Sequence, residues 1–68
     1  MIKKLLKRIP SKIRESEMTQ AEVATKIGMS RESLSNRFSG KTQLTVGELL
    51  EICELLEINP SDLLKEVE

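Results

Sequence analysis

Four polar side chains between positions 31 and 36 have the chemistry needed to recognise the edges of nucleic-acid bases: Arg31, Glu32, Ser33 and Asn36. The Arg31 guanidinium can donate two hydrogen bonds to O6 and N7 of guanine, and the Asn36 carboxamide can pair with adenine. Glu32 can accept from N4 of cytosine. A competing interpretation of Glu32 is that it stabilises a helix start, where negative charge is favourable without DNA.

A helix over about residues 30–39 is expected to position these side chains. Ser30 is a favourable N-cap, and a serine-glycine pair at 39–40 is a stop signal. Leu34 and Phe38 lie one turn apart and are expected to face inward. The four polar candidates then lie on the outward face or in the first turn.

A second helix is expected directly before this one. Thr19-Gln20-Ala21-Glu22 is a capping box and predicts a helix start at Thr19. Val23, Ala24 and Ile27 would form its apolar face. Gly28 would end it, because glycine adopts the left-handed backbone conformation without penalty. The two short helices are therefore separated by about three residues.

The N-terminal segment has an apolar stripe at helical spacing, interrupted by a proline. Because Pro10 lacks an N–H and clashes with the preceding turn, we expect either a kink or two short helices, the second starting at Pro10. Residues 1–10 are expected to form a helix or a basic arm. The stripe consists of Ile2, Leu5, Leu6, Ile9 and Ile13.

Two further helix starts follow in the C-terminal part. Thr45-Val46-Gly47-Glu48 is another capping box, and Asn59-Pro60 is a typical N-cap and first helical residue. The first of these helices is expected to place on one face Val46, Leu49, Leu50, Cys53 and Leu56. No segment alternates as a strand would. We therefore predict an all-α fold, a compact bundle of about five short helices in one domain spanning residues 1–68.

Composition excludes several classes of function. Cys53 is the one cysteine and histidine is absent, so neither an intramolecular disulfide, nor a Cys/His zinc site, nor a histidine-based triad can form. No nucleophile–base constellation or phosphate-binding glycine loop is recognisable. We expect no enzyme activity and no cofactor. Cys53 itself is expected in the core, which the aliphatic residues must build because Phe38 is the one aromatic residue.

Charge is balanced overall but unevenly distributed. Residues 1–41 hold ten basic and four acidic side chains, whereas residues 42–68 hold one basic and seven acidic. Such a molecule can turn its positive half toward phosphate. The simpler interpretation is that these charges solvate helix faces. The short apolar runs contain neither a membrane span nor a signal peptide, so we expect a soluble, cytoplasmic protein.

The segment TQAEVATKIGMSRESLSNRFSGK, residues 19–41, resembles the helix-turn-helix of the lambdoid phage repressor and Cro family, also called Xre. The matching features are Thr19-Gln20, the spacing Ala24-x3-Gly28-x5-Leu34, and Gly40-Lys41, and the likeness extends over about residues 11–65. It implies a lambda repressor-like fold that inserts helix 30–39 into the major groove of double-stranded DNA. It also implies a bacterial or phage transcriptional regulator, a repressor acting as a homodimer in the cytoplasm or nucleoid.

Phosphate contacts are expected to fix the register of such a protein on DNA. Gln20 matches the position where the family uses a glutamine to contact the DNA backbone. Position and donor chemistry add Ser30, Arg37, Lys41 and Thr42. Alternatively, Ser30 serves only as a helix cap and Thr42 only as a loop residue.

A protein-interaction module of the same fold is the alternative function. Zero net charge and the acidic C-terminal third favour it. Such a module would be a phage anti-repressor or the antitoxin of a pair, acting through a regulatory protein partner. Its surface could be formed by Leu55, Leu63, Leu64 and Val67, although these residues could equally close the core.

Overall fold

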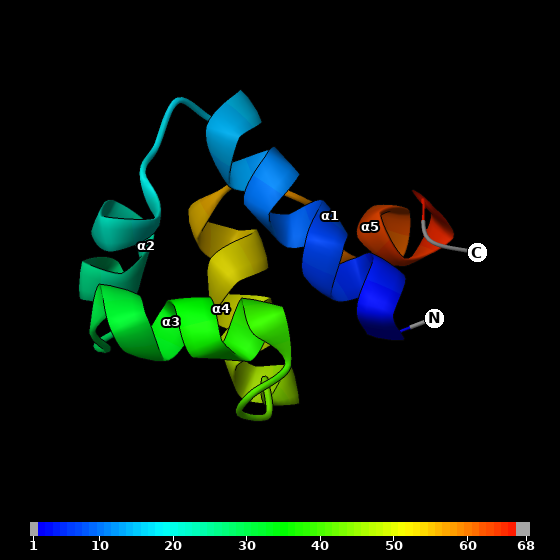
Figure 1. The fold of residues 1–68 in the computed structure, drawn as a ribbon. Helices are drawn as coiled ribbons and strands as arrows, with labels where there is room; N and C mark the ends of the chain where they lie inside the picture. Colours follow the sequence, from blue (N-terminus) through cyan, green and yellow to red (C-terminus); the bar gives the residue numbers. More distant parts are fainter. Residues whose placement is uncertain (1, 67–68) are drawn as a thin grey trace.

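Helices form all the regular secondary structure in the part of the chain that the computed structural model describes, residues 2–66, with side chains described for residues 4–65. No strand occurs within these residues, so the predicted all-α class is confirmed. Figure 1 shows α3 lying across one side of the molecule, with α1 and α4 beside it. The helices are α1 (Ile2–Glu15), α2 (Gln20–Lys26), α3 (Arg31–Ser39), α4 (Val46–Leu55) and α5 (Pro60–Glu66).

The α2–turn–α3 unit begins and ends at the predicted residues. Thr19 Oγ1 accepts from the Glu22 backbone N–H at 3.1 Å, and Glu22 Oε1 accepts from the Thr19 N–H at 3.2 Å. Gly28 has a φ of 80°, which lets the chain reverse sharply after α2. The Met29 N–H donates to the Ala24 carbonyl at 2.9 Å and closes this turn. The two helices pack against each other and against α1.

The core consists of aliphatic side chains and the thiol of Cys53. Met18 and Met29 pack at its edge, as does Phe38. The position predicted for Cys53 is therefore confirmed, and burial raises the pKa of its thiol. The buried residues are Leu5, Ile9, Ile13, Val23, Ala24, Leu34, Ile52, Cys53, Leu56 and Leu63.

Helix α1 continues through Pro10 as one element, so the alternative of two short helices is wrong. The proline removes one backbone hydrogen bond. However, the apolar stripe on both sides of it is buried, with Leu5 and Ile9 before it and Ile13 after it. Burial of this stripe offsets the local cost of the proline, which is about 3 kcal/mol in a helix interior. The expectation for Ile2 lies outside the described side chains.

Helix α4 buries only part of the face predicted for it: Cys53 and Leu56 are buried and Leu49 is partly buried. Val46 is 73% exposed and Leu50 is 48% exposed, whereas Ile52 is buried together with Cys53. A second stripe with the spacing i, i+3, i+4 and i+7 overlaps the predicted face and shares Leu49, Cys53 and Leu56 with it. The chain buries this second stripe, which Ile52 completes, and Val46 is left beyond the edge of the core.

The C-terminal leucines do not form a common exposed surface. Leu63 is buried in the core and Leu55 is partly buried, whereas Leu64 is exposed. Val67, the fourth member of the proposed interaction surface, lies outside the described residues. In the described part of the chain, no helix is both long enough and apolar enough to cross a membrane.

Candidate nucleic-acid interface

Helix α3 carries the four predicted base-reading residues. Leu34 is fully buried beneath it, with no exposed surface. Arg31 and Glu32 are exposed in the first turn, while Ser33 and Asn36 are partly exposed. Buried Leu34 therefore turns the polar side of this helix outward, where its donors and acceptors can meet another molecule.

The N-terminus of α3 is closed by Ser30. Its Oγ accepts from the Ser33 backbone N–H at 3.1 Å and lies 2.9 Å from Ser33 Oγ, to which it donates. The capping role expected for Ser30 is thus present. The cap also joins the hydroxyl groups of Ser30 and Ser33 to each other. The sequence predicted that Ser30 contacts phosphate and that Ser33 contacts bases.

The C-terminus of α3 ends at Gly40, whose φ of 86° is left-handed. The Asn36 carbonyl accepts from the Lys41 N–H at 2.9 Å and from the Thr42 N–H at 3.3 Å. These bonds pair the Asn36 carbonyl with the residues that follow the helix and fix the path of the chain after α3. Lys41 and Thr42 are both exposed there, directly beyond the helix.

Arg37, which was predicted to contact phosphate, forms hydrogen bonds with two other residues of the protein. Its Nε donates to Glu48 Oε1 at 2.9 Å, and its Nη1 donates to the Ser33 carbonyl at 3.0 Å. The same oxygen of Glu48 accepts from the Thr45 N–H at 3.0 Å. The Thr45 backbone hydrogen bond, followed by that from Arg37, lowers the pKa of Glu48 below its ordinary value.

Sequence reasoning missed Glu48 as a partner of α3. It assigned this residue to the capping box of α4, and that box is present. The contact with Arg37 joins residues 11 positions apart, so it depends on how α3 and α4 come together. No local motif could have indicated it. Gln20, the remaining phosphate candidate, is the first residue of α2 and is partly exposed.

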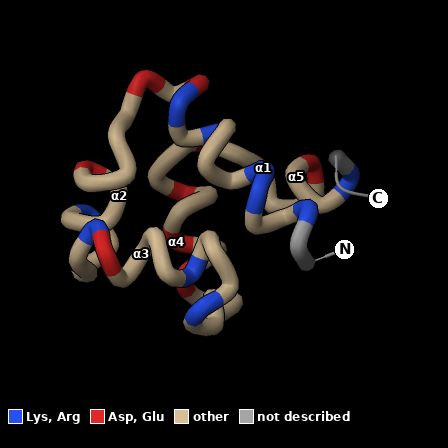
Figure 2. Tube along the Cα trace, in the orientation of Figure 1, with Lys and Arg blue, Asp and Glu red and all other residues tan. Residues whose placement is uncertain are grey.

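The two halves of the charge distribution occupy different helices. Figure 2 shows basic positions along α1 and toward both ends of α3, and acidic positions on α4. The basic residues near the ends of α3 are Arg31, Arg37 and Lys41, and the acidic residues of α4 are Glu48, Glu51 and Glu54. Among the described residues, no cluster of histidine, cysteine or acidic side chains could hold a metal ion.

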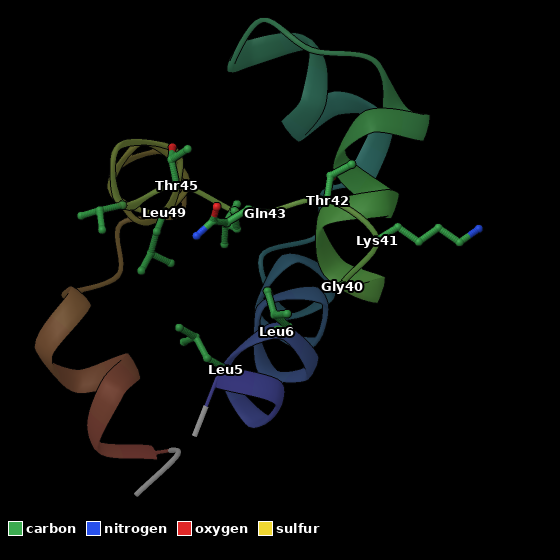
Figure 3. Close-up of a pocket in the computed structure, with 10 residues that line it drawn as sticks. Leu5, Leu6, Gly40, Lys41, Thr42, Gln43, Thr45 and Leu49 are labelled. Atoms are coloured by element: carbon green, nitrogen blue, oxygen red, sulfur yellow. The ribbon is translucent and has the colours of Figure 1, made fainter.

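An apolar groove lies beside the end of α3. It has a volume of about 390 Å³ between the N-terminal part of α1, the loop after α3 and the start of α4. In Figure 3, Leu5 and Leu6 lie on one side of it and Leu49 on the other, while the Lys41 side chain points away. The lining residues are Leu5, Leu6, Gly40, Lys41, Thr42, Gln43, Leu44, Thr45, Val46 and Leu49.

Two helices joined by a glycine turn, the second with a buried leucine and an outward polar face, define a helix-turn-helix domain. Residues 11–63, which are more than half of the chain, match the sequence model of a protein family described as helix-turn-helix. The chain belongs to the Xre/Cro-type helix-turn-helix family. This is a family of DNA-binding domains, which are typically not enzymes. No curated protein and no solved structure matches the chain.

Proposed function

We propose that the protein is a sequence-specific transcriptional regulator of a bacterium or phage, a repressor that reads the major groove of double-stranded DNA with α3. The observation that carries the proposal is the orientation of α3. Leu34 is buried beneath the helix, while Arg31 and Glu32 are exposed in its first turn. The first turn is where recognition helices of this motif contact base edges.

The proposed base-reading residues are Arg31, Glu32, Ser33 and Asn36. Lys41 and Thr42 follow α3, and Gln20 begins α2, at positions suited to hold phosphate. Ser30 has a capping role and Arg37 an internal partner, so any phosphate contact by these two would compete with bonds already made. The proposed division is that α3 specifies the sequence and the residues around its ends set the register.

The direct test is binding to a random pool of labelled duplexes, followed by sequencing of the retained fraction. An enriched site, with affinity that falls as salt rises, supports the proposal. On that site, Arg31→Ala or Asn36→Ala should each weaken binding by about tenfold, because a bidentate base contact contributes about 1–3 kcal/mol. Full binding by both variants, folded as judged by circular dichroism, would refute base reading by α3.

A homodimer on DNA is part of the proposal. One recognition helix contacts only a few base pairs, so two copies on a two-fold operator would supply the specificity that a regulator needs. The enriched site should then contain two inverted half-sites. Sedimentation of the complex should give two protein chains per full site and one per isolated half-site.

A protein-binding module is the second candidate. The apolar groove, which the exposed Val46 helps to line, and the exposed Leu50 on the same helix favour it, because such side chains are suited to contact another protein. This candidate predicts that no duplex in the pool is retained, even at low salt. It also predicts a partner whose binding is lost in Val46→Lys but kept in Arg31→Ala.

A further inference from the structure

Helix α3 is attached to the rest of the protein by a narrow apolar face. Leu34 is its one buried residue, and Phe38, one turn later, is partly buried. The other seven residues of this nine-residue helix are polar or charged. A narrow stripe resists removal of the helix but resists rotation about the helix axis weakly. A fixed presentation of the outward face therefore needs a second constraint.

Arg37 supplies such a constraint from the helix itself. Its guanidinium donates through Nη1 to the Ser33 carbonyl, one turn earlier at 3.0 Å, and through Nε to Glu48 at 2.9 Å. The side chains of Arg37 and Glu48 are 23% and 20% exposed. Since both are largely withdrawn from water, their attraction is screened less than that of a surface pair.

Glu48 is itself held in place by the start of α4. Its Oε1 accepts from the Thr45 N–H, and its own N–H donates to Thr45 Oγ1 at 3.1 Å. One carboxylate oxygen therefore joins the N-terminus of α4 to the last turn of α3. Such an anchor does not depend on a flexible surface side chain finding its partner, because the capping box already fixes the carboxylate.

We propose that Arg37 and Glu48 act as one positioning pair, which fixes the rotation of α3 and hence the direction in which Arg31 and Asn36 meet DNA. The inference rests on the proposed function of α3. It assigns Arg37 to α4 rather than to phosphate. A phosphate at Arg37 would have to displace or approach the Glu48 carboxylate 2.9 Å away, and two anions repel each other there.

The experiment is a double-mutant cycle on the selected DNA site, made in the full chain. Its variants are Arg37→Gln, Glu48→Gln and the double variant, and the single variant Arg37→Lys is measured beside them. Glutamine at position 48 keeps an oxygen that can accept from the Thr45 N–H, but it loses the negative charge. Dissociation constants are measured for the selected duplex and for an unrelated duplex of equal length, at several salt concentrations and well below the melting temperature of each variant.

Positioning predicts that each glutamine variant binds the selected duplex about fivefold more weakly and that the double variant is no weaker than either, because coupled residues are not additive. Affinity for the unrelated duplex should change much less. Arg37→Lys should bind the selected duplex as weakly as Arg37→Gln does, since an ammonium cannot bridge Glu48 and the Ser33 carbonyl as the guanidinium does.

A phosphate contact at Arg37 predicts the opposite sign at Glu48. Glu48→Gln would then strengthen binding, Arg37→Lys would retain it, and Arg37→Gln would lower the salt slope by about one. That result overturns the inference, as do additive losses or no loss at either position. If the wild type binds no duplex at all, the proposed function fails and the inference fails with it.

The matched control is Glu22→Gln. Glu22 makes the equivalent capping box on α2 with Thr19, and its side chain bonds to Thr19 within its own helix start. The substitution changes net charge by the same amount. It should leave the preference for the selected duplex unchanged, which separates the positioning effect from the effects of charge and capping.

Discussion

Gly40 and Gly47 occupy positions with opposite backbone requirements. Gly40 ends α3 with a φ of 86°, whereas Gly47 lies in the first turn of α4. A Cβ at Gly40 would touch nothing within 4 Å, so its cost would come from the backbone alone. A Cβ at Gly47 would make one ordinary contact, 3.9 Å from Thr45 Oγ1.

Alanine should therefore change stability in opposite directions at these two glycines. Gly40→Ala should lower the free energy of unfolding by about 1 kcal/mol, because alanine is strained in the left-handed region. Gly47→Ala should raise it by about 0.5 kcal/mol, because alanine loses less entropy in a helix. Urea unfolding of both variants provides the test. A loss of stability at Gly47 would show that the contact with Thr45 is less tolerant than its distance indicates.

Cys53 offers a second prediction for a single residue. Burial raises the pKa of its thiol, so the thiolate is scarcer at a given pH than in the unfolded chain. The folded protein should react with a thiol reagent much more slowly than the urea-unfolded protein, with the rate following the unfolded fraction. Rapid reaction without denaturant would mean that the core around Cys53 opens locally.

At the scale of the elements, Glu48 contributes to the stability of both α3 and α4, because it bonds to Arg37 and caps the start of α4. The shift of its pKa gives the direction in which stability changes with pH. Its folded pKa is lowered, first by the Thr45 N–H and then by Arg37. The folded state therefore favours the ionised form more than the unfolded state does. The resulting stability is present above the unfolded pKa and is lost as pH falls through the folded pKa.

The wild type should be more stable than Glu48→Gln at about pH 7, by about 0.5–1 kcal/mol, and the difference should shrink as the pH falls through the lowered pKa of the Glu48 carboxyl. Thermal melting over a series of decreasing pH values measures this. Glu51→Gln, the same change at an exposed position of α4, should show a smaller difference at neutral pH. A difference that persists in acid would mean that charge is not what Glu48 contributes.

Element boundaries were predictable because local chemistry determines them. Thr19 and Thr45 cap their helices through residues three positions away, and Gly40 ends α3 by its own backbone preference. The buried face of α4 was not predictable in the same way. Two stripes fit its sequence equally well, and only packing against the other helices selects the one that contains Ile52. The partner of Arg37 is likewise set by tertiary structure.

At the scale of the whole molecule, the unequal charge distribution determines how a neutral protein can approach DNA. Basic positions lie along α1 and toward the ends of α3, whereas acidic positions lie on α4 (Figure 2). Because release of counterions from phosphate drives such binding, the salt dependence reports how many basic side chains take part. A zero net charge therefore does not oppose binding, because the slope depends on the basic side chains placed against phosphate rather than on the net charge.

Lys41 and Lys65 allow this expectation to be tested with one kind of substitution. Lys41 is exposed just beyond α3, whereas Lys65 is exposed on α5, which Figure 1 shows on the other side of α1 from α3. Lys41→Gln should reduce the slope of log affinity against log salt by about one and weaken binding to all duplexes alike, because phosphate contacts carry no sequence information. Lys65→Gln removes the same charge and should leave the slope unchanged. Equal effects of the two variants would mean that net charge, rather than the placement of charge around α3, governs the approach to DNA.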